Sequence, residues 1–491
     1  MKSLIVVENP KRWPFDVDGA EVVAARSYLV EPRFAAMRRV AVYNLCRRLG
    51  YQTVGYYVSL LAAARGHRPL PSVATVQALS QSTLVRIAGE DEDLDREMQR
   101  ALGRLRANEF RLSIYFGRNV ARRYDRLSRA LFNQFPAPFL FARFERDDAE
   151  WRLVNVRLGA TSEIPEKHRD FVLKRANEYF ARPAGPPKRS RAFQYDLAVL
   201  WSEDDPSAPS NERAIKRFAR AAAREGIDVK TIGRDEYGRL AEFDALFIRE
   251  TTTVEHYTYR FATRAVAEGL VVIDAPEDIV RATNKVYQAE LFLRNGVPAP
   301  RTCVVHEGNR DELVARVGLP CVLKKPDGAF SVGVVKARTE EEVRERLDEL
   351  LDESELVIAQ EFTPSEFDWR IGVLDRKPLF AARYHMARGH WQIIQQEGRS
   401  RTYGKVEAVP FDEVPRRVME IALQAASLFG DGLYGVDLKE IDGRILVMEV
   451  NDNPNLDAGY EDAVRKDEIY DELARWFRTR LDRRGSDRTT R

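Results

Sequence analysis

The order of hydrophobic and polar positions predicts a chain in which strands and helices alternate. Short apolar runs predict strands at Ser3–Val7, Asp196–Trp201, Ala245–Arg249 and Val271–Ile273. Helical spacing of apolar residues predicts helices at Phe34–Leu49, Leu94–Leu112, Asn211–Glu225 and Phe261–Glu268. Two alternating stretches predict a pair of strands at Phe139–Phe144 and Trp151–Leu158. The predicted fold class is therefore α/β.

One segment rich in proline and glycine interrupts this pattern, and we interpret residues 183–191 as a linker. The expected domains are then residues 1–182, an α/β domain without a chemical motif, residues 192–278, a small βαβ unit, and residues 279–484, which carry the candidate chemistry.

Composition excludes several classes of protein. The chain has 491 residues, of which 44% are hydrophobic and 31% are charged, as in ordinary globular proteins. It has no apolar run of about eighteen residues, and its first residues resemble a strand more than a secretion signal, so we expect a cytoplasmic protein that does not enter a membrane. Cys46, Cys303 and Cys321 are scattered among apolar neighbours and are expected to be core residues.

The net charge of +2 conceals an uneven distribution. Residues 1–190 carry 33 Lys and Arg against 21 Asp and Glu, which leaves residues 191–491 with a net charge of −10. A basic region attracts acidic peptides, nucleic acids or anionic metabolites, but it can equally be a solvated surface. We favour the second interpretation and do not expect a nucleic-acid partner.

The most informative motif is a predicted β-hairpin between Leu433 and Asn451. Glu449 and Asn451 are two residues apart and face the same side of one strand, where Asp437 of the other strand can meet them. Oxygen-bearing side chains that converge on an apolar sheet suggest a magnesium site. The alternative is that these side chains lie on a solvent-exposed face of the hairpin and bind no metal. Asp437 can pair with Glu449 only if the turn has an odd number of residues or a strand contains a bulge.

A second motif, at residues 319–335, consists of a strand, a loop of small residues and another strand. Backbone N–H groups of Gly328, Ser331 and Gly333 could bind phosphate oxygens, with Lys324 as the countercharge. Such loops are common in hairpins, so this motif gains weight only from its neighbours.

Further candidates follow along the chain. Gln360, Glu361 and Phe362 end an apolar strand and could border a purine, whereas Asp368 is placed to accept from ribose hydroxyls. Arg370 and Arg383 could hold phosphate oxygens through their planar guanidinium groups. Each of these residues alone could be an ordinary charge beside a strand.

Together and in this order, the motifs in residues 280–460 resemble the ATP-grasp fold, specifically the RimK-like carboxylate–amine ligases. The whole chain resembles the variant in which a dedicated N-terminal domain precedes such a ligase, with residues 192–278 as the pre-ATP-grasp domain. The resemblance implies that Lys285 and Lys324 bind ATP phosphates and that Glu361 and Phe362 lie at the adenine edge. It further implies that Asp368 contacts the ribose and that magnesium is held by Asp437, Glu449 and Asn451.

Two positions depart from the family pattern. Ser331 stands where a glycine of the phosphate loop is usual, and residues 390–394 stand where many relatives have an Arg-x-Asn element. The second departure affects the acceptor site and part of the phosphate clamp.

The resemblance implies a ligase that forms a carbon–nitrogen bond through an acyl phosphate, using ATP and magnesium, with manganese as an alternative metal. Its substrates would be a small-molecule or peptide carboxylate and an amine, for which an amino acid is expected. Arg370 and Arg383 would act on the transferring phosphoryl group. The alternatives are an ATP-grasp kinase for a small molecule and a binding module regulated by a nucleotide. Whether the chain forms a homo-oligomer stays open.

Overall fold

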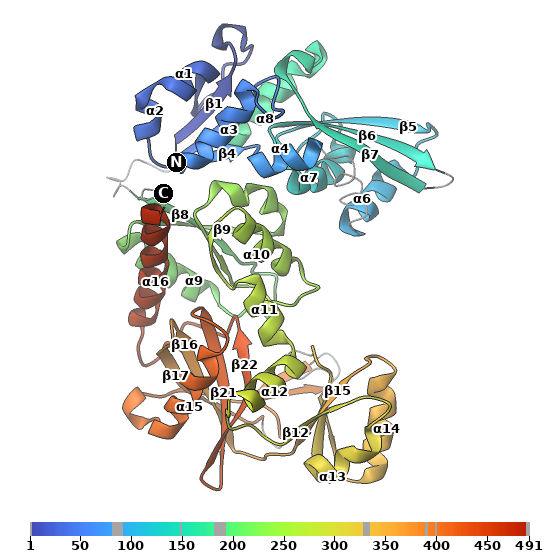
Figure 1. Ribbon diagram of the computed structural model, residues 1–491, viewed down its shortest axis with the longest axis vertical. Helices are drawn as coiled ribbons and strands as arrows, with labels where there is room; N and C mark the ends of the chain where they lie inside the picture. Colours follow the sequence, from blue (N-terminus) through green and yellow to red (C-terminus); the bar gives the residue numbers. More distant parts are fainter. Residues whose placement is uncertain are drawn as a thin grey trace. The chain divides into compact units, whose positions relative to one another are not determined.

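The computed structural model describes residues 2–80, 92–147, 150–180, 193–327, 334–387, 391–397 and 400–487 (Figure 1). The expected linker at 183–191 lies outside these residues. Two compact units are present: unit 1 comprises Met1–Ala198, Ile232–Asp244 and Leu481–Arg491, and unit 2 comprises Val199–Thr231 and Ala245–Arg480. The short 3-10 helices are η1 (Pro10–Arg12), η2 (Arg122–Tyr124), η3 (Thr161–Glu163), η4 (Glu166–His168), η5 (Arg234–Glu242), η6 (Arg310–Glu312) and η7 (Phe411–Glu413).

Unit 1 begins with a parallel sheet in the order β2-β1-β3-β4. Its strands and helices are β1 (Lys2–Val7), β2 (Ala20–Ala24), β3 (Val40–Asn44), β4 (Arg68–Leu70), α1 (Ala25–Val30), α2 (Pro32–Ala36), α3 (Val54–Ala64) and α4 (Val73–Ser80). The prediction of one helix over Phe34–Leu49 is wrong, because a short helix ends at Ala36 and β3 follows. All residues of β3 are buried. A strand buried on both faces has no alternation that would distinguish it from a helix.

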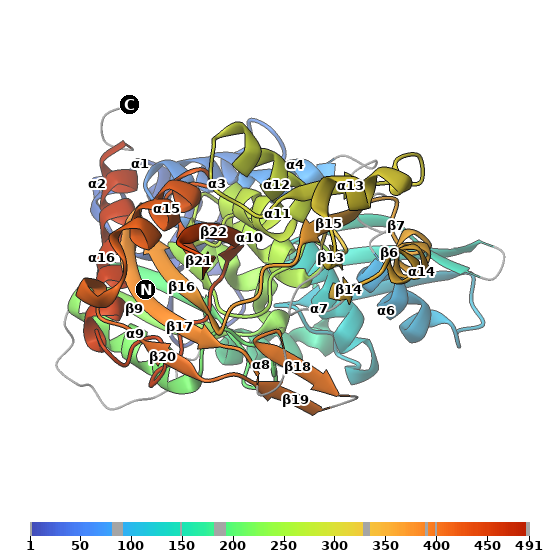
Figure 2. The same cartoon turned by 90° about the horizontal axis from the view of Figure 1, so that it is seen from below.

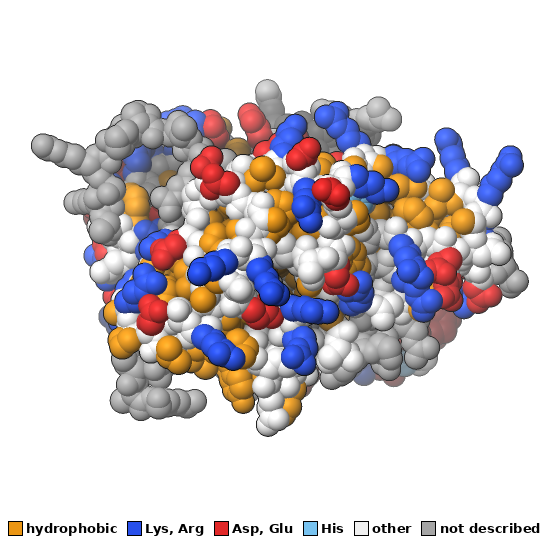
Figure 3. Space-filling model, turned by 90° about the horizontal axis from the view of Figure 1, so that it is seen from above, with side chains coloured by type: hydrophobic (Ala, Val, Ile, Leu, Met, Phe, Trp, Pro, Cys, Tyr) orange, Lys and Arg blue, Asp and Glu red, His pale blue; other side chains and the backbone are white. Residues whose placement is uncertain are grey.

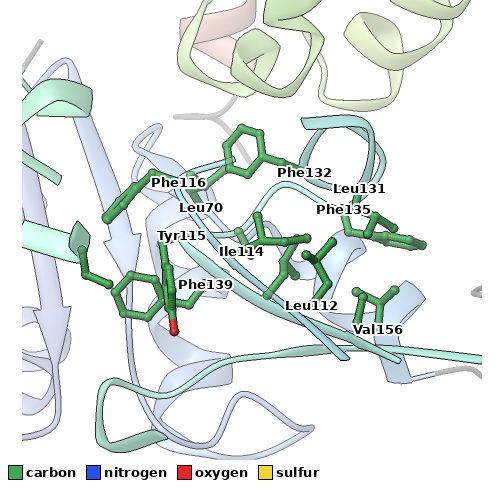
Figure 4. Packing of buried hydrophobic residues seen from close by; sticks show 14 of the residues in the cluster. Leu70, Leu112, Ile114, Tyr115, Phe116, Leu131, Phe132, Phe135, Phe139 and Val156 are labelled. Atoms are coloured by element: carbon green, nitrogen blue, oxygen red, sulfur yellow. The ribbon is translucent and has the colours of Figure 1, made fainter. Parts of the chain in front are cut away.

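A second, antiparallel sheet of unit 1 has the order β5-β6-β7. Its strands and the neighbouring helices are β5 (Glu109–Tyr115), β6 (Phe139–Asp147), β7 (Glu150–Leu158), α6 (Glu92–Leu102), α7 (Asp125–Gln134) and α8 (Arg169–Phe180). The strand pair predicted at Phe139–Phe144 and Trp151–Leu158 is confirmed. The helix predicted at Leu94–Leu112 ends at Leu102, and β5 begins seven residues later. Figure 4 shows β5 packing against α7 through Leu112, Ile114 and Leu131.

The surface charge of unit 1 is mixed. On the face in Figure 3, Lys and Arg side chains are spread among Asp and Glu side chains. Several arginines of the β5-β6-β7 sheet have carboxylate partners: Arg111 with Glu109 at 2.8 Å, and Arg143 with Glu145 at 2.9 Å. This pairing favours the interpretation of the basic region as a solvated surface.

A sheet in the order β11-β10-β8-β9 follows, and the division between the units passes through β8. Its elements are β8 (Tyr195–Leu200), β9 (Ile227–Ile232), β10 (Ala245–Ile248), β11 (Val271–Ile273), α9 (Glu212–Arg224), α10 (Tyr257–Ala267) and α16 (Asp467–Asp487). The predicted strands and helices of this segment are confirmed. Asn211 caps α9, because its side chain accepts a hydrogen bond from the N–H group of Ala214.

The rest of unit 2 contains two antiparallel sheets that lie side by side (Figures 1 and 2). The first, in the order β12-β15-β13-β14, consists of β12 (Thr302–Val305), β13 (Cys321–Lys324), β14 (Val334–Ala337) and β15 (Val357–Glu361), with α13 (Leu313–Val317) and α14 (Glu340–Leu351). The second, in the order β20-β17-β16-β21-β22, consists of β16 (Phe367–Leu374), β17 (Lys377–His385), β20 (Val406–Ala408), β21 (Leu433–Ile441) and β22 (Arg444–Asp452).

Three helices accompany the second sheet, and a short hairpin stands apart from it. The helices are α11 (Pro276–Thr283), α12 (Lys285–Arg294) and α15 (Arg416–Ser427), and the hairpin consists of β18 (Ile394–Glu397) and β19 (Ser400–Tyr403). Residues of α15 pack against Trp369, Ile371 and Leu438 of the sheet in one hydrophobic core. This core covers one face of the sheet, and polar residues that include Arg370 and Asp437 lie on the other face.

Cys46, Cys303 and Cys321 are buried and unpaired, as predicted. In the described part of the chain, no helix is both long enough and apolar enough to cross a membrane.

Candidate active site

The β21–β22 hairpin brings the three predicted metal ligands to one face. Asp437 pairs with Glu449, and Gly435 pairs with Asn451. The turn between Ile441 and Arg444 has two residues, both with positive φ, as a tight hairpin turn requires. Such a turn alone would pair Asp437 with Met448. A bulge next to Asp437 shifts the register by one residue. The predicted pairing is therefore confirmed.

These side chains contact one another and Arg370. The Asn451 amide donates to Asp437 Oδ2 at 3.1 Å and to Glu449 Oε1 at 3.3 Å. Arg370 is opposite Asp437 on β16 and holds it by two hydrogen bonds, of which Nη2 to Oδ2 measures 2.7 Å. Gly435 permits this approach, because a Cβ there would lie 3.1 Å from Cδ of Arg370. Asp437, Glu449, Asn451 and Arg370 thus form a single cluster.

The electrostatics of the cluster depend on its burial. Burial raises the pKa of Asp437 to about 6, although Arg370 opposes this shift. Burial alone would also raise the pKa of Glu449, but Lys285, Lys324 and Arg370 together lower it. Glu449 is therefore held as an anion between cations.

Two lysines approach this cluster from the other elements. Lys285 is the first residue of α12, and its N–H group donates to the carbonyl of Pro326 at 2.8 Å. Lys324 ends β13 and donates to Gln360 Oε1 at 2.8 Å. Burial lowers the pKa of Lys324 to about 8. The positive charge of Lys285 also lowers this pKa, whereas the negative charge of Glu449 raises it. Cations placed together with carboxylates are what a metal-bound polyphosphate requires.

The predicted adenine edge lies at the end of β15. The N–H groups of Glu361 and Phe362 already donate to the carbonyls of Arg301 and Pro320, at 2.9 and 3.2 Å. Backbone donation from these two residues to a purine therefore does not fit the structure, although their carbonyl groups and the Phe362 ring can still contact one. Trp391 packs edge to face against that ring, with 5.7 Å between the centroids.

Asp368 lies on the same face as Arg370, two residues along β16. It accepts from Ser365 Oγ at 2.9 Å and from Lys439 Nζ at 2.7 Å. Lys439 is a residue that our sequence analysis missed. Its position in a largely apolar hairpin is the signal that could have identified it.

Arg383 is not brought to this cluster, which corrects our prediction of its role. It pairs with Trp369 across β16 and β17, so the two side chains share the opposite face of the sheet. Its guanidinium group stacks on Trp369 and Phe367, at 4.8 and 5.2 Å from the ring centroids. Strand alternation therefore separates Arg383 from Arg370. Gly328, Ser331 and Gly333 lie outside the described residues.

The donors in the cluster fit magnesium. Asp437, Glu449 and Asn451 offer only hard oxygen ligands, and substrate phosphates commonly complete such a site. Among the described residues, no group of three or more His, Cys, Asp or Glu side chains could hold a metal ion by itself. Asp437 and Glu449 supply two carboxylates, so a magnesium ion held here would need further oxygen ligands, such as those of a substrate phosphate.

Comparison with known proteins places these features in a family. A RimK-like ATP-grasp domain model matches residues 282–476, and a RimK-like ATP-grasp N-terminal domain model matches residues 25–175. A protein of Vibrio vulnificus named "Probable alpha-L-glutamate ligase" is 27% identical over 232 residues, which are 46% of this chain and 74% of that protein. A protein of the same name from Syntrophotalea carbinolica is 27% identical over 242 residues, 48% of this chain and 77% of that protein.

Solved structures with some likeness include D-cycloserine synthetase, with a TM-score of 0.46 and 20% identity over 58% of this chain and 99% of that one. Another is the D-alanine–D-alanine ligase of Bacillus anthracis, with a TM-score of 0.46 and 15% identity over 60% of this chain and 99% of that one. The two family models together match most of the chain and both describe RimK-like ATP-grasp proteins. The chain thus contains a RimK-like ATP-grasp domain preceded by a RimK-like ATP-grasp N-terminal domain, and it is an ATP-dependent carboxylate–amine ligase.

Proposed function

We propose that the enzyme activates a substrate carboxylate with the γ-phosphate of ATP and then joins it to the amino group of an amino acid. The supporting observation is the convergence of Asp437, Glu449 and Asn451 on one face of the sheet, beside Lys285 and Lys324. A binding module would not need a buried and a half-buried carboxylate held among cations.

Each residue of the cluster has a role in this proposal. Lys285 and Lys324 bind ATP phosphates, and Asp368 accepts from the ribose. Asp437, Glu449 and Asn451 would hold magnesium, which would neutralise charge on the phosphate oxygens when bound. Attack of the carboxylate on the γ-phosphate releases ADP and forms an acyl phosphate, which the amine attacks with loss of phosphate. The protein contributes position and charge and needs no covalent nucleophile.

Arg370 contributes the remaining positive charge. Its guanidinium group has five N–H donors, and two bonds to Asp437 leave others free for a phosphoryl oxygen. We assign to it the stabilisation of the transferring phosphoryl group. Arg383, on the opposite face, has no part in this step.

The substrates are proposed only by class. Relatives named α-L-glutamate ligases support an amino acid as the amine. We infer that the acid is a small molecule or a peptide, and that residues 1–182 contribute to its recognition, since the nucleotide motifs all lie beyond residue 280. Consumption of ATP favours a cytoplasmic enzyme.

Trapping of the acyl phosphate tests this proposal. Wild-type enzyme is incubated with ATP, magnesium, pooled small acids and acidic peptides, and hydroxylamine in place of the amine. We expect a hydroxamate, detected by mass spectrometry. Glu449→Gln should reduce its formation at least tenfold, because a metal-bound charge is lost while the volume is preserved. Glu413→Gln changes an exposed carboxylate of the same domain and should have no effect.

Two results would contradict this proposal. If wild-type enzyme consumes ATP and yields a stable phosphate ester of an alcohol without any hydroxamate, the kinase alternative replaces the ligase mechanism. A hydroxamate formed equally well by Glu449→Gln would refute the metal site.

A further inference from the structure

Lys439 is an unusual residue for the interior of a sheet. It lies on β21, and only 8% of its surface is exposed. Leu438 pairs with Trp369 of β16, so Lys439 and Asp368 are the next residues along the two antiparallel strands. Cross-strand neighbours of this kind share a face. The register of the sheet therefore places the ammonium group against the carboxylate.

The contacts of Asp368 are concentrated on one of its oxygens. Lys439 Nζ and Ser365 Oγ both donate to Oδ1, at 2.7 and 2.9 Å, and Lys439 also donates to Ser365 Oγ at 2.6 Å. Among the described residues, none donates a hydrogen bond to Oδ2 of Asp368. One oxygen is thus fixed by the protein, and the other can accept from a ligand.

Stability alone does not explain this pair. Burying two charges costs several kcal/mol per ion by desolvation, and apolar residues of similar volume often serve stability equally well. An ion pair that is retained in a buried position therefore suggests a geometric purpose. A lysine that reaches a carboxylate across two rigid strands fixes the orientation of that carboxylate.

The surroundings connect the pair to the rest of the cluster. Burial lowers the pKa of Lys324, and the nearby charge of Lys439 lowers it further. Lys439 therefore lies close to the lysine that binds phosphates in our proposal. Lys439 thus contacts Asp368 directly and adds to the positive charge around Lys324.

We propose that Lys439 is a positioning residue for the nucleotide, which fixes Oδ1 of Asp368 so that Oδ2 accepts a ribose hydroxyl. This inference rests on the proposed use of ATP at this site. It implies that the enzyme prefers ATP to a nucleotide lacking the hydroxyl and that the preference depends on Lys439. A residue needed only for folding would affect stability and leave this preference unchanged.

Nucleotide binding measured by calorimetry on the full chain tests the inference. Wild type should bind ATP about tenfold more tightly than 2′-deoxy-ATP or 3′-deoxy-ATP, since the lost bond is made to a charged acceptor. Lys439→Met, which has a similar length, should reduce this ratio to less than about twofold. Lys377→Met alters an exposed lysine of the same sheet and should retain the full ratio. Asp368→Asn should also lose the preference.

Two further variants keep the test decisive if Lys439→Met does not fold. Lys439→Gln can still donate to Asp368 and should retain part of the ratio, and Ser365→Ala should lower it modestly. A folded Lys439→Met with the wild-type ratio would overturn the inference, as would a wild type that binds all three nucleotides equally. Failure of wild type to bind ATP at all would instead refute the proposed function.

Discussion

Replacing Arg370 with methionine should leave Asp437 buried without its countercharge. Asp437 is 6% exposed, and in the folded protein it accepts two hydrogen bonds from the guanidinium group. Methionine retains much of the length of arginine but none of its donors. The Asn451 amide would remain as the only hydrogen-bond donor to Asp437 Oδ2 among the described residues.

The size of the effect follows from the burial. Breaking a buried ion pair by removing one partner costs about 3–5 kcal/mol. Burial already raises the pKa of Asp437 to about 6. Without Arg370 this pKa rises further, so the carboxyl group takes up a proton and limits the loss at neutral pH. We therefore expect the lower end, about 3 kcal/mol, which corresponds to about 6–12 °C in the unfolding midpoint of a domain of some 200 residues.

A double-mutant cycle distinguishes the loss of the Arg370–Asp437 interaction from other destabilising effects of the two substitutions. Thermal unfolding of the full chain is compared for wild type, Arg370→Met, Asp437→Asn and the double variant. The double variant should be destabilised by at least 2 kcal/mol less than the sum of the single variants. Magnesium with ATP should raise the midpoint of Arg370→Met more than that of wild type, because the metal supplies the missing positive charge. Strictly additive effects, or a midpoint for Arg370→Met within 1 °C of wild type, would refute this reasoning.

Three further outcomes are expected. Burial, aided by a nearby aspartate, raises the pKa of Glu250 from about 4.5 to about 7. The folded chain therefore holds a proton that the unfolded chain has released, and stability falls as pH rises through this window. Glu250→Gln should remove this loss and be more stable than wild type at pH 8, by on the order of 2 kcal/mol, in urea titrations at pH 5 and 8. Trp391→Phe should reduce the change in tryptophan fluorescence on ATP addition, because Trp391 packs against Phe362 at the proposed purine site. Gly435→Ala should lower the thermal midpoint and the ligase rate together, because its Cβ would lie 2.7 Å from Cβ of Pro454 and 3.1 Å from Cδ of Arg370.

The hairpin was the part of the site that sequence alone predicted best. Asp437, Glu449 and Asn451 stand out because carboxylates and amides are rare within apolar strands and must be compensated there. The requirement for either an odd-numbered turn or a bulge followed from counting residues across the turn. The choice of a bulge over a longer turn, and the position of the bulge beside Asp437, did not follow, because only the pairing of the two strands shows them.

Strands buried on both faces were the main source of error. In β17, Leu379, Phe380, Ala381 and Ala382 are all at most 2% exposed, so no alternation shows which face Arg383 takes. In β3, the same lack of alternation led to the prediction of a helix. The alternation of apolar and polar residues along a strand shows which side chains face the core only when the two faces of the sheet meet different environments.

The positions of arginines and lysines in the sequence predicted the site less well than the positions of the carboxylates did. The guanidinium group of Arg383 can be buried against Phe367 and Trp369, since a weakly hydrated planar cation stacks favourably on aromatic rings. Its presence beside a phosphate motif therefore did not require it to face the phosphate. Lys439 is the converse case, because its partner Asp368 is 71 residues away in the sequence. Only the register between β16 and β21 shows that the two charges meet, and that register also places Arg370 on Asp437. The strand register therefore determines which lysine and arginine side chains face the site. A role for such a side chain in this fold can be assigned only once it is known which face of the sheet the side chain lies on.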